Sequence, residues 1–265
     1  MNILDKIIAH KRTELRDLPE AKVTVDSLRA ELAQLSPRRD FVGSLLKPAK
    51  GNLGLIAEVK KASPSKGVIR KDFDPVAIAK AYEAAGASCL SVLTDEEFFQ
   101  GSLDYLREIR EAVELPLLRK DFMIDERQLS EAIQYGADAV LLIVACLDDE
   151  KLKNMHSLAV GAGLAVLVEV HNQKELERAL AVDARLIGVN NRDLTDFTVD
   201  LGLTERLAGQ IVQEVPFKRI LVAESGIRNR ADVEQLENCG ANAILVGTSL
   251  MSQADIAEKV AELIG

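Results

Sequence analysis

The chain has 265 residues, with 33 Lys or Arg and 42 Asp or Glu, so its net charge at neutral pH is −9. This balance argues against a general binder of nucleic acid or of an anionic membrane, because both need a basic surface. An apolar fraction of 48% is enough for a large core and excludes a disordered chain. With seven Phe, three Tyr and no Trp, that core must be aliphatic.

Cysteine and histidine usage favours a metal-free protein of a reducing compartment. Cys89, Cys146 and Cys239 are widely spaced and odd in number, and no C-x-x-C occurs, so neither a disulfide framework nor a zinc site is expected. No apolar run reaches the length of a membrane span or forms the centre of a signal peptide, and we expect a cytoplasmic protein. The isolated histidines lack metal spacing and are expected in surface or capping roles. They are His10, His156 and His171.

Residues 1–50 are predicted to be a helical extension. Their first helix carries an apolar stripe, and a second helix is expected over 25–35, ended by Ser36-Pro37. An independent helical hairpin of this length would hold little core, so we expect the extension to pack on the rest of the chain. The stripe consists of Ile3, Leu4, Ile7, Ile8 and Leu15.

Residues 51–265 repeat one pattern: an apolar run, a helical stretch, a Gly-Ala pair and the next apolar run. Gly86, Gly136 and Gly240 fit the position just after a helix, where glycine takes positive φ without a Cβ penalty. Eight runs recur about every 27 residues, a spacing typical of βα units. The runs are 53–59, 89–93, 117–119, 139–144, 165–170, 186–189, 220–223 and 243–246.

These runs predict an α/β fold, namely a (β/α)₈ TIM barrel in a single domain with the helical extension packed on it. Several runs are apolar almost throughout, as strands buried on both faces should be. The rival is an open, doubly wound sheet, which would carry G-x-G-x-x-G after its first strand if it bound a dinucleotide. That motif is absent, because Gly161-Ala162-Gly163 lacks the third glycine and precedes a strand.

Charged residues end many of the predicted strands. In an α/β barrel these ends meet at one mouth, where active sites lie. Any one of them is equally well explained as a solvated loop residue, but several lysines and glutamates converging provide candidate acids and bases with mutually tuned pKa values. Alternation places Glu58 and Lys60 on the same face. The others are Lys120, Glu169, Asn190, Arg192 and Glu224.

Two further signals indicate the ligand. Ser225-Gly226 and Gly247-Thr248 follow the last two strands, where barrels often bind phosphate, and residues 247–251 fit a short extra helix. The polar segment 63–67 is long enough to cover a ligand.

Four Phe lie in the predicted βα loops; at least one is expected in the core, and the others predict a flat apolar pocket for an aromatic ring. They are Phe98, Phe99, Phe122 and Phe197.

At these positions the sequence resembles the indole-3-glycerol phosphate synthase family. The resemblance covers nearly the whole chain and rests on RRDF (38–41), IAEVKKASPSKG (56–67), LLRKDFMID (117–125), LVEVH (167–171), GVNNRDL (188–194), ESGI (224–227) and VGTSLM (246–251). It implies ring closure of 1-(2-carboxyphenylamino)-1-deoxyribulose 5-phosphate to indole-3-glycerol phosphate, CO₂ and water. Decarboxylation restores the aromatic ring, so no cofactor is expected.

The resemblance also implies residue roles. Lys120 would be the general acid and Glu169 its partner in the loss of water, while Lys60 would hold the carboxylate or phosphate; which lysine donates each proton stays open. Glu58 and Asn190 would position groups around the lysines. The implied sugar and carboxylate contacts are Ser63, Arg192, Glu224 and Ser225. The implied phosphate contacts are Gly226, Gly247 and Thr248, and the implied ring pocket is Phe99, Phe122, Leu142 and Leu194.

Three alternatives remain. A phosphoribosylanthranilate isomerase would be expected to use a Cys at the end of the first strand, where this chain has Glu58-Val59-Lys60. A Schiff-base aldolase would use Lys120, and a non-enzymatic sensor would need no acid–base pair.

The expected partner is a small sugar phosphate carrying an anthranilate ring, without nucleic acid or membrane, bound by a monomer or weak homo-oligomer. Because the net charge repels such an anion, local cations must recruit it. Neutralising one of these cations should lower activity far more than neutralising a surface lysine such as Lys259.

Overall fold

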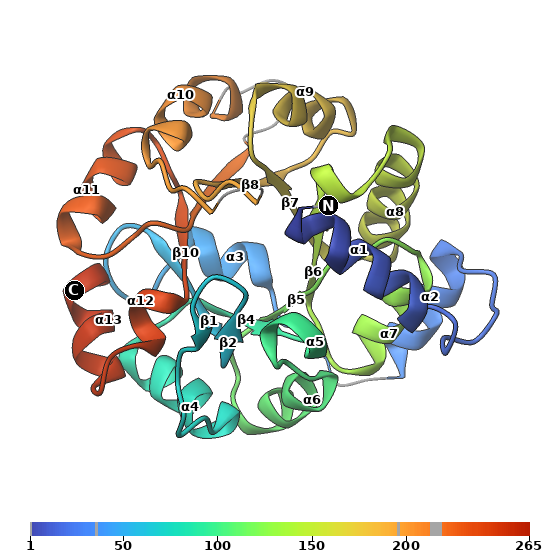
Figure 1. Ribbon diagram of the computed structural model, residues 1–265, viewed down its shortest axis with the longest axis horizontal. Coiled ribbons are helices and arrows are strands. Elements are labelled where there is room, and N and C mark those ends of the chain that lie inside the picture. Colours follow the sequence, from blue (N-terminus) through green and yellow to red (C-terminus); the bar gives the residue numbers. More distant parts are fainter. Residues whose placement is uncertain (1, 35–36, 195–196, 213–218) are drawn as a thin grey trace.

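The computed structural model describes residues 2–34, 37–194, 197–212 and 219–265. Eight parallel strands close into a barrel in the order β1-β10-β9-β8-β7-β6-β5-β4 (Figure 1). All eight predicted runs form these strands, so the predicted TIM barrel is confirmed. The strands are β1 (Gly54–Val59), β4 (Cys89–Leu93), β5 (Leu117–Lys120), β6 (Ala139–Ile143), β7 (Ala165–Val170), β8 (Leu186–Asn190), β9 (Ile220–Glu224) and β10 (Ala243–Val246).

Helices alternate with the strands and surround the barrel (Figure 1). Gly86, Gly136 and Gly240 have φ of 100°, 90° and 94°, which confirms the predicted left-handed turns after helices. The outer helices are α4 (Pro75–Ala85), α6 (Leu103–Ala112), α7 (Arg127–Gln134), α8 (Asp149–Ala162), α9 (Gln173–Ala181), α10 (Gly202–Ile211), α11 (Arg230–Asn238) and α13 (Ile256–Ile264).

Short elements occupy several loops at the carboxyl ends of the strands. The segment after β1 folds as an antiparallel hairpin of β2 (Ala62–Ser63) and β3 (Gly67–Val68). The extra helix expected after the last strand is α12 (Thr248–Met251). The remaining short elements are α5 (Glu96–Phe99) and the 3₁₀ turn η1 (Val144–Cys146).

Strand alternation divides the apolar side chains into two cores. One fills the barrel interior with residues such as Ile56, Leu118 and Leu167. The other lies between the barrel and the outer helices, with residues such as Val59 and Val168. Because neighbouring residues of a strand face opposite cores, a polar residue one step beyond an inward position faces outward.

The amino-terminal extension contacts both ends of the barrel. Its helices are α1 (Ile3–Glu14), α2 (Val25–Ala33) and α3 (Phe41–Leu46), of which α2 packs against α7 and α8. The predicted end of the second helix, residues 35–36, lies outside the described residues. Helix α3 was not predicted from the sequence. It closes the barrel at the start of the strands, where Cys89 donates to the carbonyl of Phe41 at 3.5 Å.

Helix α1 lies at the opposite end, where the strands finish, in front of the barrel in Figure 1. Its Lys11 contacts Asp95 and Asp121, which follow β4 and β5. Within the described ranges, no helix combines the length and apolar character needed to cross a bilayer.

Candidate active site

A cavity of about 610 Å³ opens at the carboxyl ends of the barrel strands. All but one of the site residues predicted from the sequence line it. Leu142 is the exception. The convergence predicted for the strand ends is therefore confirmed, because closing the barrel brings residues up to 190 positions apart in the chain to one mouth. The predicted residues that line the cavity are Glu58, Lys60, Ser63, Phe99, Lys120, Phe122, Glu169, Asn190, Arg192, Leu194, Glu224, Ser225, Gly226, Gly247 and Thr248.

Lys120, the last residue of β5, lies between two carboxylates. Its Nζ donates to Oε2 of Glu169 at 2.6 Å and to Oε2 of Glu224 at 3.2 Å. Burial disfavours the ammonium, but Glu169, Glu224 and Glu58 together outweigh it and raise the pKa of Lys120 above its usual range. Lys120 is therefore a fixed cation at neutral pH.

Glu169, on β7, is 1% exposed and surrounded by donors. Its second oxygen, Oε1, accepts from Nδ2 of Asn190 at 3.0 Å and lies 3.2 Å from Nε2 of His171. Burial would raise the pKa of Glu169, but Lys120 and His171 hold it well below its usual range. This carboxylate is thus ionised and fixed in orientation.

Glu224 ends β9 and fits beside Gly188, where a Cβ would overlap its Oε1. That oxygen is buried and has no hydrogen-bond partner among the described residues. Burial raises the pKa of Glu224 to about 8; Lys120 opposes this shift and Glu169 adds to it. Two neighbouring carboxyls thus differ in protonation, which is how one site can provide both an acid and a base.

The opposite wall comes from β1. Lys60 pairs with Glu58; both lie on the same face, as the alternation predicted, and that face is inward, whereas Val59 faces the outer core. Gly247 leaves room for this pair, since a Cβ there would overlap Oε2 of Glu58. Ser63 also lines the cavity, and its buried Oγ has no hydrogen-bond partner among the described residues.

A polar rim follows the last three strands. Arg192 donates to the carbonyl of Phe197 at 3.1 Å, which fixes its guanidinium at the cavity. Ser225 and Gly226 have φ of 64° and 84°, so the chain turns sharply beside the cavity. Lys66 and Ser249, from the segments predicted beside the ligand, also line the cavity, and so does Arg228, which was not predicted.

One wall is apolar. The rings of Phe99 and Phe122 lie 5.9 Å apart at 35°, and Leu194 and Phe197 complete the wall. Phe98, the remaining loop phenylalanine, packs edge-on against His10 instead.

Predictions for four residues need correction. Leu142 belongs to the outer core, because its side chain alternates with the inward Leu141 and Ile143, which do line the cavity. Lys259 is not a surface lysine: it lines the cavity and is 13% exposed. His156 and His171 are not surface or cap residues: His156 is buried within α8, and His171 is mostly buried against Glu169. The motif LVEVH does not show that α9 buries His171, because this helix begins after the motif ends.

The barrel and its mouth define the class of protein. An eight-stranded α/β barrel with ammonium and carboxylate groups paired at the carboxyl ends of its strands has the arrangement of a TIM-barrel enzyme. Among the residues that the structure describes, no group of three or more His, Cys, Asp or Glu side chains is arranged to hold a metal ion.

Comparison with known proteins identifies the family. A family model described as "Indole-3-glycerol phosphate synthase" matches residues 4–263. A relative of that name from Polaromonas naphthalenivorans is 49% identical over 265 residues, covering 100% of this chain and 99% of its own. Another from Rhodopirellula baltica is 52% identical over 257 residues, covering 97% and 96%. The chain belongs to the indole-3-glycerol phosphate synthase family, and it is a carboxy-lyase of tryptophan biosynthesis.

Solved structures show the same fold at low identity. A 3-hexulose-6-phosphate synthase superposes with a TM-score of 0.61 at 14% identity, covering 80% of this chain and 98% of its own. This likeness extends to the barrel alone.

Proposed function

We propose that this cavity converts 1-(2-carboxyphenylamino)-1-deoxyribulose 5-phosphate to indole-3-glycerol phosphate, CO₂ and water. The observation that carries the proposal is the Lys120 ammonium held 2.6 Å from the ionised Glu169 inside a cavity with one aromatic wall. A cation and a base lie together beside a place for an aryl ring, which a mere binding site would not need.

Ring closure is the first chemical step. The aryl carbon that bears the carboxylate attacks the ketone carbon, a C–C bond forms, and Lys120 donates its proton to the developing alkoxide. An alkoxide is more basic than an amine, so the transfer is favourable despite the raised pKa of Lys120. The C–CO₂ bond then breaks, and its electron pair restores the aromatic ring, so no electron sink is required.

Loss of water completes the indole. The departing hydroxyl carries the former ketone oxygen, which already holds the proton from Lys120, so a second acid must protonate it. We assign that step to Lys60, whose ammonium faces the same cavity from the opposite wall. Glu169 removes a proton from the methylene carbon next to nitrogen and can pass it to Lys120. Two protons are donated and one recovered, which matches the one proton that decarboxylation of a carboxylate consumes.

The remaining residues are assigned to binding and positioning. Glu58 orients Lys60, and Asn190 orients Glu169. Glu224 and Ser225 bind sugar hydroxyls, for which the buried Oε1 of Glu224 is available. The other assigned groups are Arg192 and Ser63 for the substrate carboxylate and sugar, Gly226, Gly247 and Thr248 for the phosphate, and Phe99, Phe122 and Leu194 for the ring.

A direct assay tests the function. Substrate added to the pure protein should yield indole fluorescence and CO₂, and the protein itself contributes no Trp emission. Neither signal over a range of pH, from a protein shown to be folded by circular dichroism, would contradict the proposal. Borohydride added with substrate should trap no adduct on Lys120, whereas a Schiff-base aldolase would leave one.

We further propose that the chain acts as one domain, as a cytoplasmic monomer or weak homo-oligomer that binds no nucleic acid. Contacts of α1 and α3 with the two ends of the barrel and the net charge of −9 support this. Sedimentation of the protein with and without duplex DNA tests the oligomeric state and the absence of nucleic-acid binding.

A further inference from the structure

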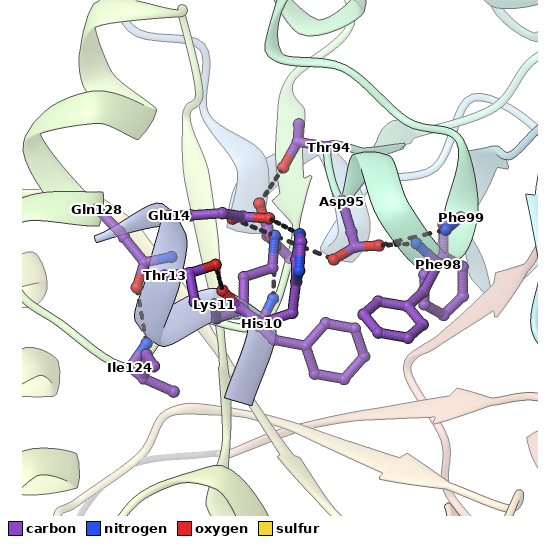
Figure 2. Close-up of polar contacts among 12 residues, drawn as sticks. His10, Lys11, Thr13, Glu14, Thr94, Asp95, Phe98, Phe99, Ile124 and Gln128 are labelled. Atoms are coloured by element: carbon purple, nitrogen blue, oxygen red, sulfur yellow. Dashed lines mark hydrogen bonds and ion pairs between the residues drawn. The ribbon is translucent and has the colours of Figure 1, made fainter. Parts of the chain in front are cut away.

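One buried cation connects the amino-terminal helix to the aromatic wall of the cavity. Lys11, on α1, is 2% exposed, and its Nζ lies 3.0 Å from Oδ2 of Asp95 and 2.8 Å from Oδ1 of Asp121. Both carboxylates are equally buried, at 0% and 2% exposed. In Figure 2, Lys11 points from α1 toward Asp95, with Phe98 and Phe99 on the far side of that carboxylate. A buried lysine in contact with two buried aspartates needs a structural reason, because desolvating the charges is costly.

Each of these aspartates holds the backbone of an aromatic residue. Oδ1 of Asp95 accepts from the N–H groups of Phe98 and Phe99, at 2.8 and 3.2 Å, and so begins the single turn of α5 (Figure 2). Oδ1 of Asp121 accepts from the N–H of Phe122 at 2.8 Å. The backbone N–H groups of Phe99 and Phe122, the two phenylalanines of the ring pocket, therefore donate to two different carboxylates, and both carboxylates pair with the ammonium group of Lys11.

The two carboxylates depend on Lys11 to different degrees. Asp121 also accepts from Thr94 at 2.6 Å and Arg119 at 3.0 Å through its Oδ2. Oδ2 of Asp95 has no hydrogen-bond partner among the described residues, so the ion pair with Lys11 is the interaction that compensates its burial. Burial lowers the pKa of Lys11, but Asp121 and Asp95 outweigh this and raise it above its usual range, so the ammonium stays charged.

The apolar face of α1 supports the same wall. Ile7 is buried in one cluster with Phe122, against which Ile3, Phe98 and Phe99 pack. His10 lies edge-on to Phe98, with ring centroids 5.8 Å apart. Helix α1 thus lies behind the aromatic wall, and no residue of α1 lines the cavity.

We propose that Lys11 is a positioning residue that sets the distance between Phe99 and Phe122 and thereby the fit of the substrate's aryl ring. It acts through Asp95 and Asp121 and touches no substrate atom. The loops after β4 and β5 also meet where Thr94 donates to Oδ2 of Asp121 at 2.6 Å, but Lys11 contacts both of the carboxylates that accept from the N–H groups of these phenylalanines. This inference rests on the proposed function, because it needs an aryl ligand.

Binding of two ligands to purified variants separates this role from general stability. Indole-3-glycerol phosphate carries the ring, and glycerol 3-phosphate carries only the phosphate arm. Lys11→Met should raise the Kd for the first about tenfold or more and leave the Kd for the second unchanged, because a displacement of about 1 Å in a binding wall is costly. Indole emission reports the first Kd directly, and competition against it reports the second.

Arg39→Met is the matched control. Arg39 ties the extension to the other end of the barrel through the carbonyl groups of Leu115 and Arg110, so its loss loosens the extension without touching Asp95 or Asp121. It should leave both Kd values unchanged. The inference would be overturned if Lys11→Met lost the same affinity for both ligands or changed neither Kd. It would also be overturned if Arg39→Met changed the two Kd values as Lys11→Met does.

A milder variant covers the case in which Lys11→Met does not fold. Asp95→Asn keeps a side-chain oxygen to begin α5 and breaks only the charge pair with Lys11. It should raise the Kd for the ring-bearing ligand several-fold and leave the Kd for glycerol 3-phosphate unchanged. An unchanged Kd for both ligands would overturn the inference. If the wild-type protein neither binds indole-3-glycerol phosphate nor turns over substrate, the proposed function fails instead.

Discussion

Nε2 of His171 lies 3.2 Å from Oε1 of Glu169, the oxygen to which Lys120 does not donate. Nδ1 of the same ring lies 3.0 Å from Oε2 of Glu175, on α9. Burial disfavours the imidazolium, but these two carboxylates raise the pKa of His171 to about 10. Glu169 is thus held by one cation on each oxygen. The nearby thiol of Cys146 is kept neutral by burial, which raises its pKa.

Replacing His171 should impair turnover. His171→Asn removes a charged partner that orients Glu169, and hydrogen bonds to charged groups contribute roughly 1.5–3 kcal/mol, so we expect kcat to fall by about tenfold or more. KM should change little, because the side chain does not line the cavity. Steady-state fluorescence assays measure both constants, and an unchanged kcat would contradict the positioning of Glu169 by His171.

The same variant should change the pH dependence of stability. A histidine whose pKa is raised by folding stabilises fully below its ordinary value of 6.5, and that contribution is lost as the pH rises toward 10. The Tm difference between wild type and His171→Asn should therefore be largest near pH 6 and shrink by pH 9–10. His156→Asn is the control: burial lowers the pKa of His156, so its Tm difference should instead shrink as the pH falls below 6.5.

The ion pair at the centre of the cavity should be indispensable. Lys120→Met or Glu169→Gln should lower kcat by about 10²–10⁴, the range for a lost general acid or base, and retain binding of indole-3-glycerol phosphate. Lys153→Met, at an exposed position of α8, should stay within about twofold of wild type and replaces Lys259 as the surface control. Full turnover in either site variant would leave the cavity as a binding site only.

Glu224 should set an alkaline limit to activity. Because burial raises its pKa to about 8, it holds a proton at neutral pH and can donate to a sugar hydroxyl, and it loses this ability as the pH rises. We expect kcat/KM of the wild type to decline above about pH 8. Glu224→Gln keeps a neutral donor, so its profile should lack that decline although its maximum is lower. If the variant keeps the alkaline limb, another group titrates there.

Alanine variants of the neighbouring residues Leu141 and Leu142 test which face of β6 points into the cavity. Both are almost fully buried, so either change to Ala should lower the free energy of unfolding by about 2–5 kcal/mol, measured by urea denaturation. Only Leu141 faces the cavity, so only Leu141→Ala should raise KM. A raised KM in Leu142→Ala alone would restore the original assignment from the sequence.

The fold and most of the site could be predicted because both depend on local periodicity. Apolar runs such as 165–170 and the glycines that follow helices specify strands and turns within a few residues of sequence. Strand alternation alone placed Lys60 and Glu58 on the same face. Leu142 shows the limit of a family resemblance: none of the quoted motifs covers it, and it lies one residue from an inward position. Its pairing with the outward Val168 shows that it faces the outer core.

The contacts that could not be predicted join segments far apart in the chain. Nothing in the first helix distinguishes Lys11 from other charged residues until the closed barrel brings Asp95 and Asp121 to it, and nothing in LVEVH shows that α9 buries His171 against Glu169. By itself, the sequence determined an aliphatic eight-stranded barrel and the residues at its mouth, since strand spacing and alternation are local. Tertiary structure alone decided which charges are desolvated and paired, and hence which carboxyl is ionised, because burial and charge proximity depend on the whole fold.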